Sequence, residues 1–259
     1  FLMTVSTKKD HKLVELFLSN QTSLEKFSLF KELKSAAKAS LDETGFPTLK
    51  EEEYKFTNIN KRILDKIKKF TSPNAISNIA EVLESHPLVN SLVGFKLIRN
   101  NGVYEPELSS NTEGSFTVTP FADLHQEQAE EIGTIETVSK DPFTALNSYS
   151  FESGIHIEVA DGSIIEQPIL LVDVISADSM GECVQPRTYF KAGKNSQATV
   201  IEITIFVNES AVFLNEVGEW NIDSNAHIRH YKLQNGHKNE LGVSNTSSNI
   251  ERDATFTSV

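Results

Sequence analysis

Ala198-Thr199-Val200 recurs as Ala226-His227-Ile228 and again as Ala254-Thr255-Phe256, and this repeat decides the fold. The interval is 28 residues both times, and each copy follows a short polar corner. Self-similarity at a fixed period indicates a repeat architecture. Each copy leads into residues rich in Val, Ile, Thr and aromatics, which is the composition of strands. The repeat therefore favours a parallel β-helix over a sandwich. We expect Ala198, Ala226 and Ala254 to stack on successive coils, and Val200, Ile228 and Phe256 to form an inward column.

The same pattern begins earlier in the chain, near residue 150. Gly154 to Val159 alternates between apolar and polar residues, Asp161-Gly162 makes a corner, and Ile164 to Ile175 resumes the apolar pattern. The predicted fold is therefore mainly β, with a parallel β-helix over 150–259 and an N-terminal helical α+β domain over 1–149.

Residues 1–149 show helical periodicity with a few strand patterns. A capping box at Thr22-Ser23-Leu24-Glu25 begins the second helix, and Gly45 ends it. Asn101-Gly102 predicts a tight hairpin turn. The predicted helices are 8–19, 22–42, 59–67, 76–83, 123–132 and 142–149, and the predicted strands are 92–98, 103–104 and 115–119. Together these elements would cover the first open coil of the β-helix.

Composition narrows the possible partners and compartment. The 259 residues carry 24 Lys and Arg against 36 Asp and Glu, a net charge of −12, which argues against nucleic acid or an anionic membrane as the main partner. The one cysteine, Cys183, excludes an intrachain disulfide framework, and no apolar run is long enough to span a membrane. We therefore expect a cytoplasmic protein.

A second motif lies in the helical part of the chain. Gly45-Phe46-Pro47-Thr48, followed by Glu53-Tyr54-Lys55-Phe56-Thr57, resembles the signature of the SufD branch of the SufB/SufD family, with Tyr54 and Phe56 replacing the usual Trp and Tyr. The segments 103–109, 154–168 and 198–202 are also similar to family segments. We interpret the motif as a helix connector with Tyr54 and Phe56 packed into the core. Its members, expected to be structural, are Gly45, Pro47, Thr48, Glu53, Tyr54, Lys55, Phe56 and Thr57.

The resemblance implies a scaffold of the SUF iron-sulfur cluster assembly system and not an enzyme. It implies a right-handed β-helix that pairs with SufB, a C-terminal helical domain that binds the ATPase SufC, and a transient iron-sulfur cluster at the SufB interface of the complete protein. The family's cluster-site Cys-Ser-His-Gly type segment does not occur in this sequence. We therefore expect a chain cut within the β-helix that binds no cofactor or SufC by itself and covers its last coil by forming a homodimer.

Candidate site residues are few. Cys183 is either a soft metal ligand or, as we favour, a small buried hydrophobe. His227 and His230 should point to opposite faces of a strand, with His230 near Glu202 one coil away. We interpret Glu51-Glu52-Glu53 as a solvated face with one capping member, not as a metal site.

No catalytic motif can be identified in the sequence. The alternative function, from another class, is a β-helical polysaccharide lyase, because repeated corners fit that class as well.

Overall fold

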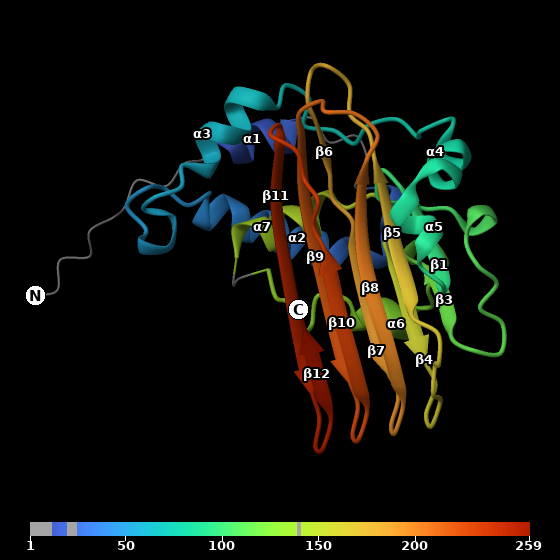
Figure 1. The fold of residues 1–259 in the computed structure, drawn as a ribbon. Helices are drawn as coiled ribbons and strands as arrows, with labels where there is room; N and C mark the ends of the chain where they lie inside the picture. Colours follow the sequence, from blue (N-terminus) through green and yellow to red (C-terminus); the bar gives the residue numbers. More distant parts are fainter. Residues whose placement is uncertain (1–11, 20–24, 139–140) are drawn as a thin grey trace, which may run out of the picture.

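Two six-stranded sheets face each other in the computed structural model, which describes residues 12–19, 25–138 and 141–259 (Figure 1). The first sheet contains, in spatial order, β12 (Thr255–Ser258), β10 (His227–Leu233), β8 (Gln197–Phe206), β5 (Ile169–Ile175), β1 (Phe95–Asn100) and β2 (Val103–Tyr104). The second contains β11 (Glu240–Ile250), β9 (Val212–Ile222), β7 (Arg187–Ala192), β4 (Ile155–Val159) and β3 (Thr117–Pro120), with β6 (Glu182–Val184) beside β9.

The chain passes from the second sheet to the first in each coil. The successive pairs are β4 and β5, β7 and β8, β9 and β10, and β11 and β12. Equivalent strands of neighbouring coils pair in parallel, whereas β2 and β3 pair antiparallel with β1 and β4. This arrangement is a β-solenoid with a helical N-terminal part, as the sequence predicted.

A column of left-handed residues sets the corners of the coils. Gly162, Asn195, Asn225 and Asp253 have φ angles of 71°, 59°, 59° and 59°. Gly, Asn and Asp adopt this conformation more readily than other residues. The corners also bond to one another, since the N–H groups of Asn195 and Asn225 each donate to a carbonyl of the next corner at 3.1 Å. These polar residues therefore define the repeat more accurately than the apolar residues beside them.

The predicted stacking is correct for one interval and wrong for the other. Ile228 pairs with Phe256, 28 residues on, but on its other side it pairs with Ala198, 30 residues back. Val200 consequently lies beside His230, and Ala198 does not stack on Ala226. The two extra residues lie between the end of the β8–β10 pairing and the start of the β9–β11 pairing. Eight residues separate the paired positions Ile203 and Val212, whereas six separate their partners Leu233 and Glu240.

Helices pack on the outer faces of both sheets (Figure 1). Apolar side chains of α4 and α5 cover β1, β5 and β8, and α1, α2, α3 and α7 contribute to a cluster that includes Phe213 of β9. The helices are α1 (Lys12–Ser19), α2 (Lys31–Thr44), α3 (Ile59–Lys66), α4 (Ile79–Ser85), α5 (Pro87–Ser91), α6 (Gln126–Glu131) and α7 (Pro142–Ser150), with 3₁₀ turns η1 (Glu25–Phe30), η2 (Glu52–Tyr54), η3 (Pro106–Leu108) and η4 (Phe121–Asp123). None of the helices in the described ranges is long and apolar enough to cross a membrane.

The helix boundaries follow the sequence signals only in part. The helix predicted over 76–83 begins at Ile79, after its N-cap residue Asn78, and the helix predicted over 123–132 is limited to α6 because η4 precedes it. Gly45, with φ 59°, ends α2 and donates its N–H to Leu41. The predicted capping box lies mostly outside the described residues. The strand predicted from residue 92 begins instead at Phe95, because Leu92 ends α5 and Gly94 lies where a Cβ would be 2.3 Å from the Pro168 oxygen.

The strands that precede residue 150 belong to the solenoid sheets. The predicted hairpin at Asn101-Gly102 forms between β1 and β2, and β1 also pairs in parallel with β5. In the second sheet, β3 pairs with β4. The division into 1–149 and 150–259 stays a prediction, but both sheets extend across it.

Candidate functional site: buried polar networks and an acidic groove

A belt of charged residues lies between the two sheets, where apolar side chains would be expected. It lies between the apolar cluster near the tight corners, which includes Phe190 and Trp220, and the smaller cluster around Val212. Its charged side chains are 2% to 15% exposed. We call it the inner polar belt, and its members are Arg99, Asp173, Thr188, Glu202, Glu216, His230 and Lys232.

The members of the inner polar belt pair with one another across successive coils. The Arg99 guanidinium makes a two-pronged contact with Asp173, with Nε to Oδ1 at 2.7 Å, and donates to the Thr188 hydroxyl at 2.9 Å. Lys232 Nζ lies 2.6 Å from Glu216 Oε2 and 3.2 Å from Glu202 Oε2. Arg99 and Asp173 thus form one pair on neighbouring strands, whereas Lys232 is shared between Glu202 on the neighbouring strand β8 and Glu216 on β9 of the opposite sheet.

His230 completes this belt beside Glu202. Its Nε2 lies 3.5 Å from Glu202 Oε1, and its Nδ1 lies 2.9 Å from the Ser258 hydroxyl. His227, on the same strand, is exposed. The predictions that the two rings point to opposite faces and that His230 lies near Glu202 are both confirmed.

The pKa values of the belt's carboxyl groups shift in opposite directions. Burial raises the pKa of Glu202, but the His230 ring and the Lys232 ammonium outweigh it and lower the pKa to about 2. Burial raises the pKa of Glu216 despite the Lys232 contact. The cavity among these side chains has a volume of about 10 Å³, which is room for a water molecule and not for an organic substrate.

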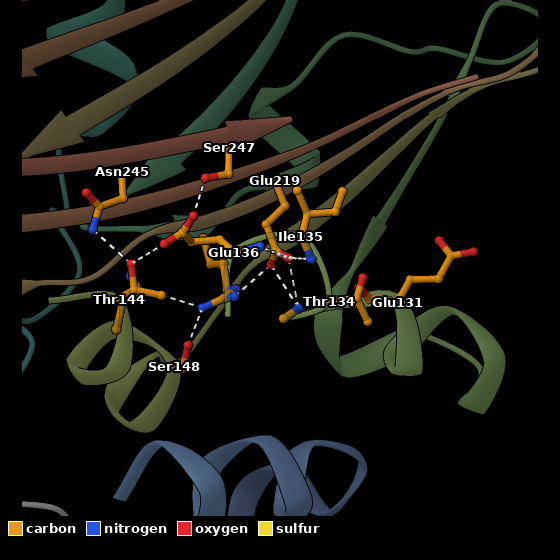
Figure 2. A network of polar contacts seen from close by, with 12 residues as sticks. Glu131, Thr134, Ile135, Glu136, Thr144, Ser148, Glu219, Asn245 and Ser247 are labelled. Atoms are coloured by element: carbon orange, nitrogen blue, oxygen red, sulfur yellow. Dashed lines mark hydrogen bonds and ion pairs between the residues drawn. The ribbon is translucent and has the colours of Figure 1, made fainter. Parts of the chain in front are cut away.

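A second polar network lies on the outer face of the second sheet (Figure 2). The fully buried Glu219 carboxylate accepts hydrogen bonds from the backbone N–H groups of Gly133, Ile135 and Glu136 at 2.9 to 3.2 Å. Arg187, also fully buried, donates to the same carboxylate at 2.6 Å. This anion-binding turn is thus occupied by the protein's own side chain.

The same network holds α7 against the sheet. Glu136 accepts from the hydroxyl of Thr144 at 3.2 Å and from the hydroxyl of Ser247 (Figure 2). Arg187 also donates to Asn147 and Ser148 on α7, at 3.1 and 2.8 Å. These contacts fix the helical part to the solenoid at several points.

An acidic groove of about 560 Å³ lies beside α6 and is lined by Glu127, Glu130 and Glu131, among others. Glu131 pairs with Lys191 at 2.6 Å and lies 3.6 Å from Nε2 of the fully buried His156. Burial lowers the pKa of His156, so this ring favours its neutral form. Within the described residues, no three His, Cys, Asp or Glu side chains are placed to hold a metal ion together.

Cys183 is a buried thiol, as we favoured. It is 1% exposed, and its Sγ lies 3.7 Å from the Lys69 carbonyl oxygen, to which the thiol donates. Burial raises the pKa of the thiol. A buried protonated thiol of this kind is a poor ligand and a poor nucleophile.

The motif at 45–57 is only partly packed into the core. Tyr54 lies against Phe143, with ring centroids 6.4 Å apart, but Phe56 is 89% exposed, so the prediction that both rings are buried is wrong for Phe56. Tyr54 is the last residue of the 3₁₀ turn η2, whereas Phe56 lies in the turn that follows it. Thr57 N–H then donates to the Tyr54 carbonyl and closes the turn.

Other contacts of the motif agree with a structural role, which stays a prediction. The Pro47 carbonyl accepts from the Asn60 amide at 2.9 Å, and the Glu51 carboxylate accepts from Thr48 N–H at 3.0 Å. Glu52 is exposed, as expected of a solvated acidic segment, and Glu51 occupies the N-cap position of η2 but makes no side-chain capping hydrogen bond to that turn. The Glu53 side chain lies outside the described residues, and Lys55 is exposed.

Several residues of these networks were missed by the sequence reasoning. Asp173 lies in the otherwise apolar run Ile169–Ile175, and Arg99 and Lys232 alternate in phase with inward apolar residues. A charge at an inward position of an alternating strand is the signal that could have identified them.

Comparisons with known proteins agree with this architecture. The family model described as "SufBD protein N-terminal region" matches residues 7–171, and the one described as "SUF system FeS cluster assembly, SufBD core domain" matches residues 174–259. The iron-sulfur cluster assembly protein SufD of Escherichia coli (strain K12) is 28% identical over 193 residues, which cover 73% of this chain and 43% of that protein. The aligned region is therefore less than half of that relative.

Proposed function

The chain belongs to the SufB/SufD family of the SUF iron-sulfur cluster assembly system and is of the SufD type, and from this premise we propose that it is a non-catalytic scaffold subunit of a cytoplasmic SUF complex. In this proposal it pairs with SufB through the β-solenoid and associates with the ATPase SufC. The iron-sulfur cluster is the transient cargo of that complex.

The observation that carries the proposal is the consecutive match of two family models along 7–171 and 174–259. The fold supports a scaffold, because the backbone N–H of Gly133 donates to Glu219 and Arg187 donates to Asn147 and Ser148 on α7, contacts that fix the helical part to the solenoid. The small size of the interior cavity also supports a non-catalytic role. Repeated corners alone would fit a polysaccharide lyase equally well, but the family match favours the scaffold.

Co-expression with the SufB and SufC proteins of the same genome tests the proposal. The affinity-tagged chain should retain SufB at equal stoichiometry in size-exclusion chromatography, and SufC should join the assembly. A double variant with Glu202→Gln and His230→Asn changes only side chains inside the solenoid. Its retention of SufB, compared with that of the unchanged chain, shows whether the interior charges affect the complex. SufC is expected to join through SufB, since the chain by itself is expected not to bind it. Failure of the folded chain to retain SufB would refute the proposal.

A further inference from the structure

A basic segment stands out in this acidic chain. Residues 55–70 contain six Lys or Arg and one Asp, a net charge of +5, whereas the whole chain carries −12. The segment includes α3 and the end of the motif at 45–57. Figure 1 shows α3 to one side of the sheets, on the outside of the fold.

Half of these cations are already engaged by the protein. Lys69 pairs with Asp178 and Glu182, and the ammonium groups of Lys66 and Lys68 donate to the carbonyls of Lys238 and Leu64. Lys55, Lys61 and Arg62 are exposed, and within the described part of the chain no carboxylate pairs with them.

An exposed aromatic ring lies beside Lys55. Phe56 is 89% exposed, the highest fraction among the large apolar residues found exposed, and the Nζ of Lys55 lies 5.5 Å from its ring centroid. Lys61 and Arg62 follow at the start of α3, whose first turn has no acidic residue. Exposed aromatic and Arg side chains are the residue types that dominate binding energy at protein interfaces.

We propose that Lys55, Phe56, Lys61 and Arg62 form a docking surface for an acidic segment of a partner protein. The inference is independent of the SUF assignment. It rests on charge complementarity. Three exposed cations that have no carboxylate partner in the described part of the chain, together with an apolar ring, match a short segment that carries carboxylates beside an apolar residue. Charges farther apart than the Debye length of about 8 Å are screened, so a short segment can bind here without meeting the acidic remainder of the surface.

The size and surroundings of the surface argue against nucleic acid and anionic membranes as its ligands. Nucleic acid and anionic membranes extend well beyond α3, whose eight residues span about 12 Å, and would meet the net negative charge of the remaining chain.

Fluorescence anisotropy with a labelled peptide tests the surface in the intact 259-residue chain. The probe is a peptide of Glu-Glu-Leu repeats, and its Gln-for-Glu version is the neutral comparison. The double variant K61E/R62E should weaken binding at least about tenfold, and Phe56→Ala about tenfold, whereas the controls Lys194→Glu and Val93→Ala, also exposed, should stay within about twofold. Thermal melts establish that each variant is folded.

Several results would overturn the proposal. One is equal binding of the acidic and neutral peptides, or no binding of either. Another is peptide binding that K61E/R62E leaves unchanged. A third is tighter binding of phosphatidylglycerol vesicles or single-stranded DNA than of the peptide, with the same loss in K61E/R62E, because this would identify a different class of occupant.

Discussion

Replacing Glu219 with Gln tests the energetic importance of the network on the outer face of the second sheet. The carboxylate accepts from three backbone N–H groups and pairs with Arg187, and both side chains are fully buried. Removing one partner of a buried ion pair costs about 3–5 kcal/mol, because the other charge stays buried and unpaired. The side-chain NH₂ of Gln would also face N–H groups that now donate to the carboxylate. Leaving such a buried donor without an acceptor adds about 1 kcal/mol to the loss of stability. We therefore expect Glu219→Gln to lose about 4–6 kcal/mol, a large part of the stability of a typical domain.

Urea unfolding followed by fluorescence measures this loss directly. Trp220 is the single tryptophan, is 1% exposed, and adjoins Glu219 in sequence, so its emission reports on the same strand. The matched control is Glu209→Gln, since Glu209 is exposed and lies 3.9 Å from Lys238; it should change stability by less than about 0.5 kcal/mol. Adding Arg187→Met to Glu219→Gln should recover part of the loss. A loss for Glu219→Gln no larger than that of the control would refute this reasoning.

Three further predictions concern the solenoid. Because the pKa of Glu202 is about 2 in the fold, where His230 and Lys232 outweigh burial, its stabilising contribution is present above its ordinary value of 4.5 and is lost as pH falls toward 2. Glu202→Gln should therefore reduce the acid dependence of the unfolding free energy over that range, measured by urea titrations at each pH. Burial raises the pKa of Cys183 and shields it, so its thiol should react with a disulfide reagent only as fast as the chain unfolds; rapid labelling of the folded chain would contradict this. Asn225 has φ 59°, so Asn225→Val should cost about 1–2 kcal/mol whereas Asn225→Gly should be nearly neutral, as compared by thermal unfolding.

The solenoid could be predicted because its signal is local and repeated. Strand composition, the polar corners and the alternation after Gly154 each indicate the same unit, and the structure contains it. The register could not be taken from apolar similarity, because Val200 and Ile228 look equivalent although β8 extends three residues past the position that ends β10. The left-handed corner residues Asn195, Asn225 and Asp253 were the better guide, since backbone geometry restricts them more than packing restricts a β-branched side chain.

The candidate sites were less predictable, because they depend on contacts between distant segments. The inner polar belt joins Arg99 to Asp173, and the outer network joins Gly133 to Glu219, pairs that are 74 and 86 residues apart. No sequence motif indicates that residues at either of these separations would be in contact. Phe56 is an error of the opposite kind, since its local motif predicted a buried ring. The ring is exposed because its position depends on the direction of one short turn, which the sequence does not specify.

These long-range pairs also bear on how the chain is organised. Arg99 on β1 neutralises Asp173 on β5, and the backbone of 133–136 supplies three of the donors to Glu219 on β9. A chain beginning at residue 150 would bury Asp173 without its cation and would lack the amides that satisfy Glu219, and an unpaired buried charge is costly enough to shift or abolish folding. The helical part is therefore not only a cover for the first coil. Residues before 150 provide the cation that balances Asp173 inside the solenoid and the donors that satisfy Glu219 on its outer face, so the two parts are expected to fold as one unit.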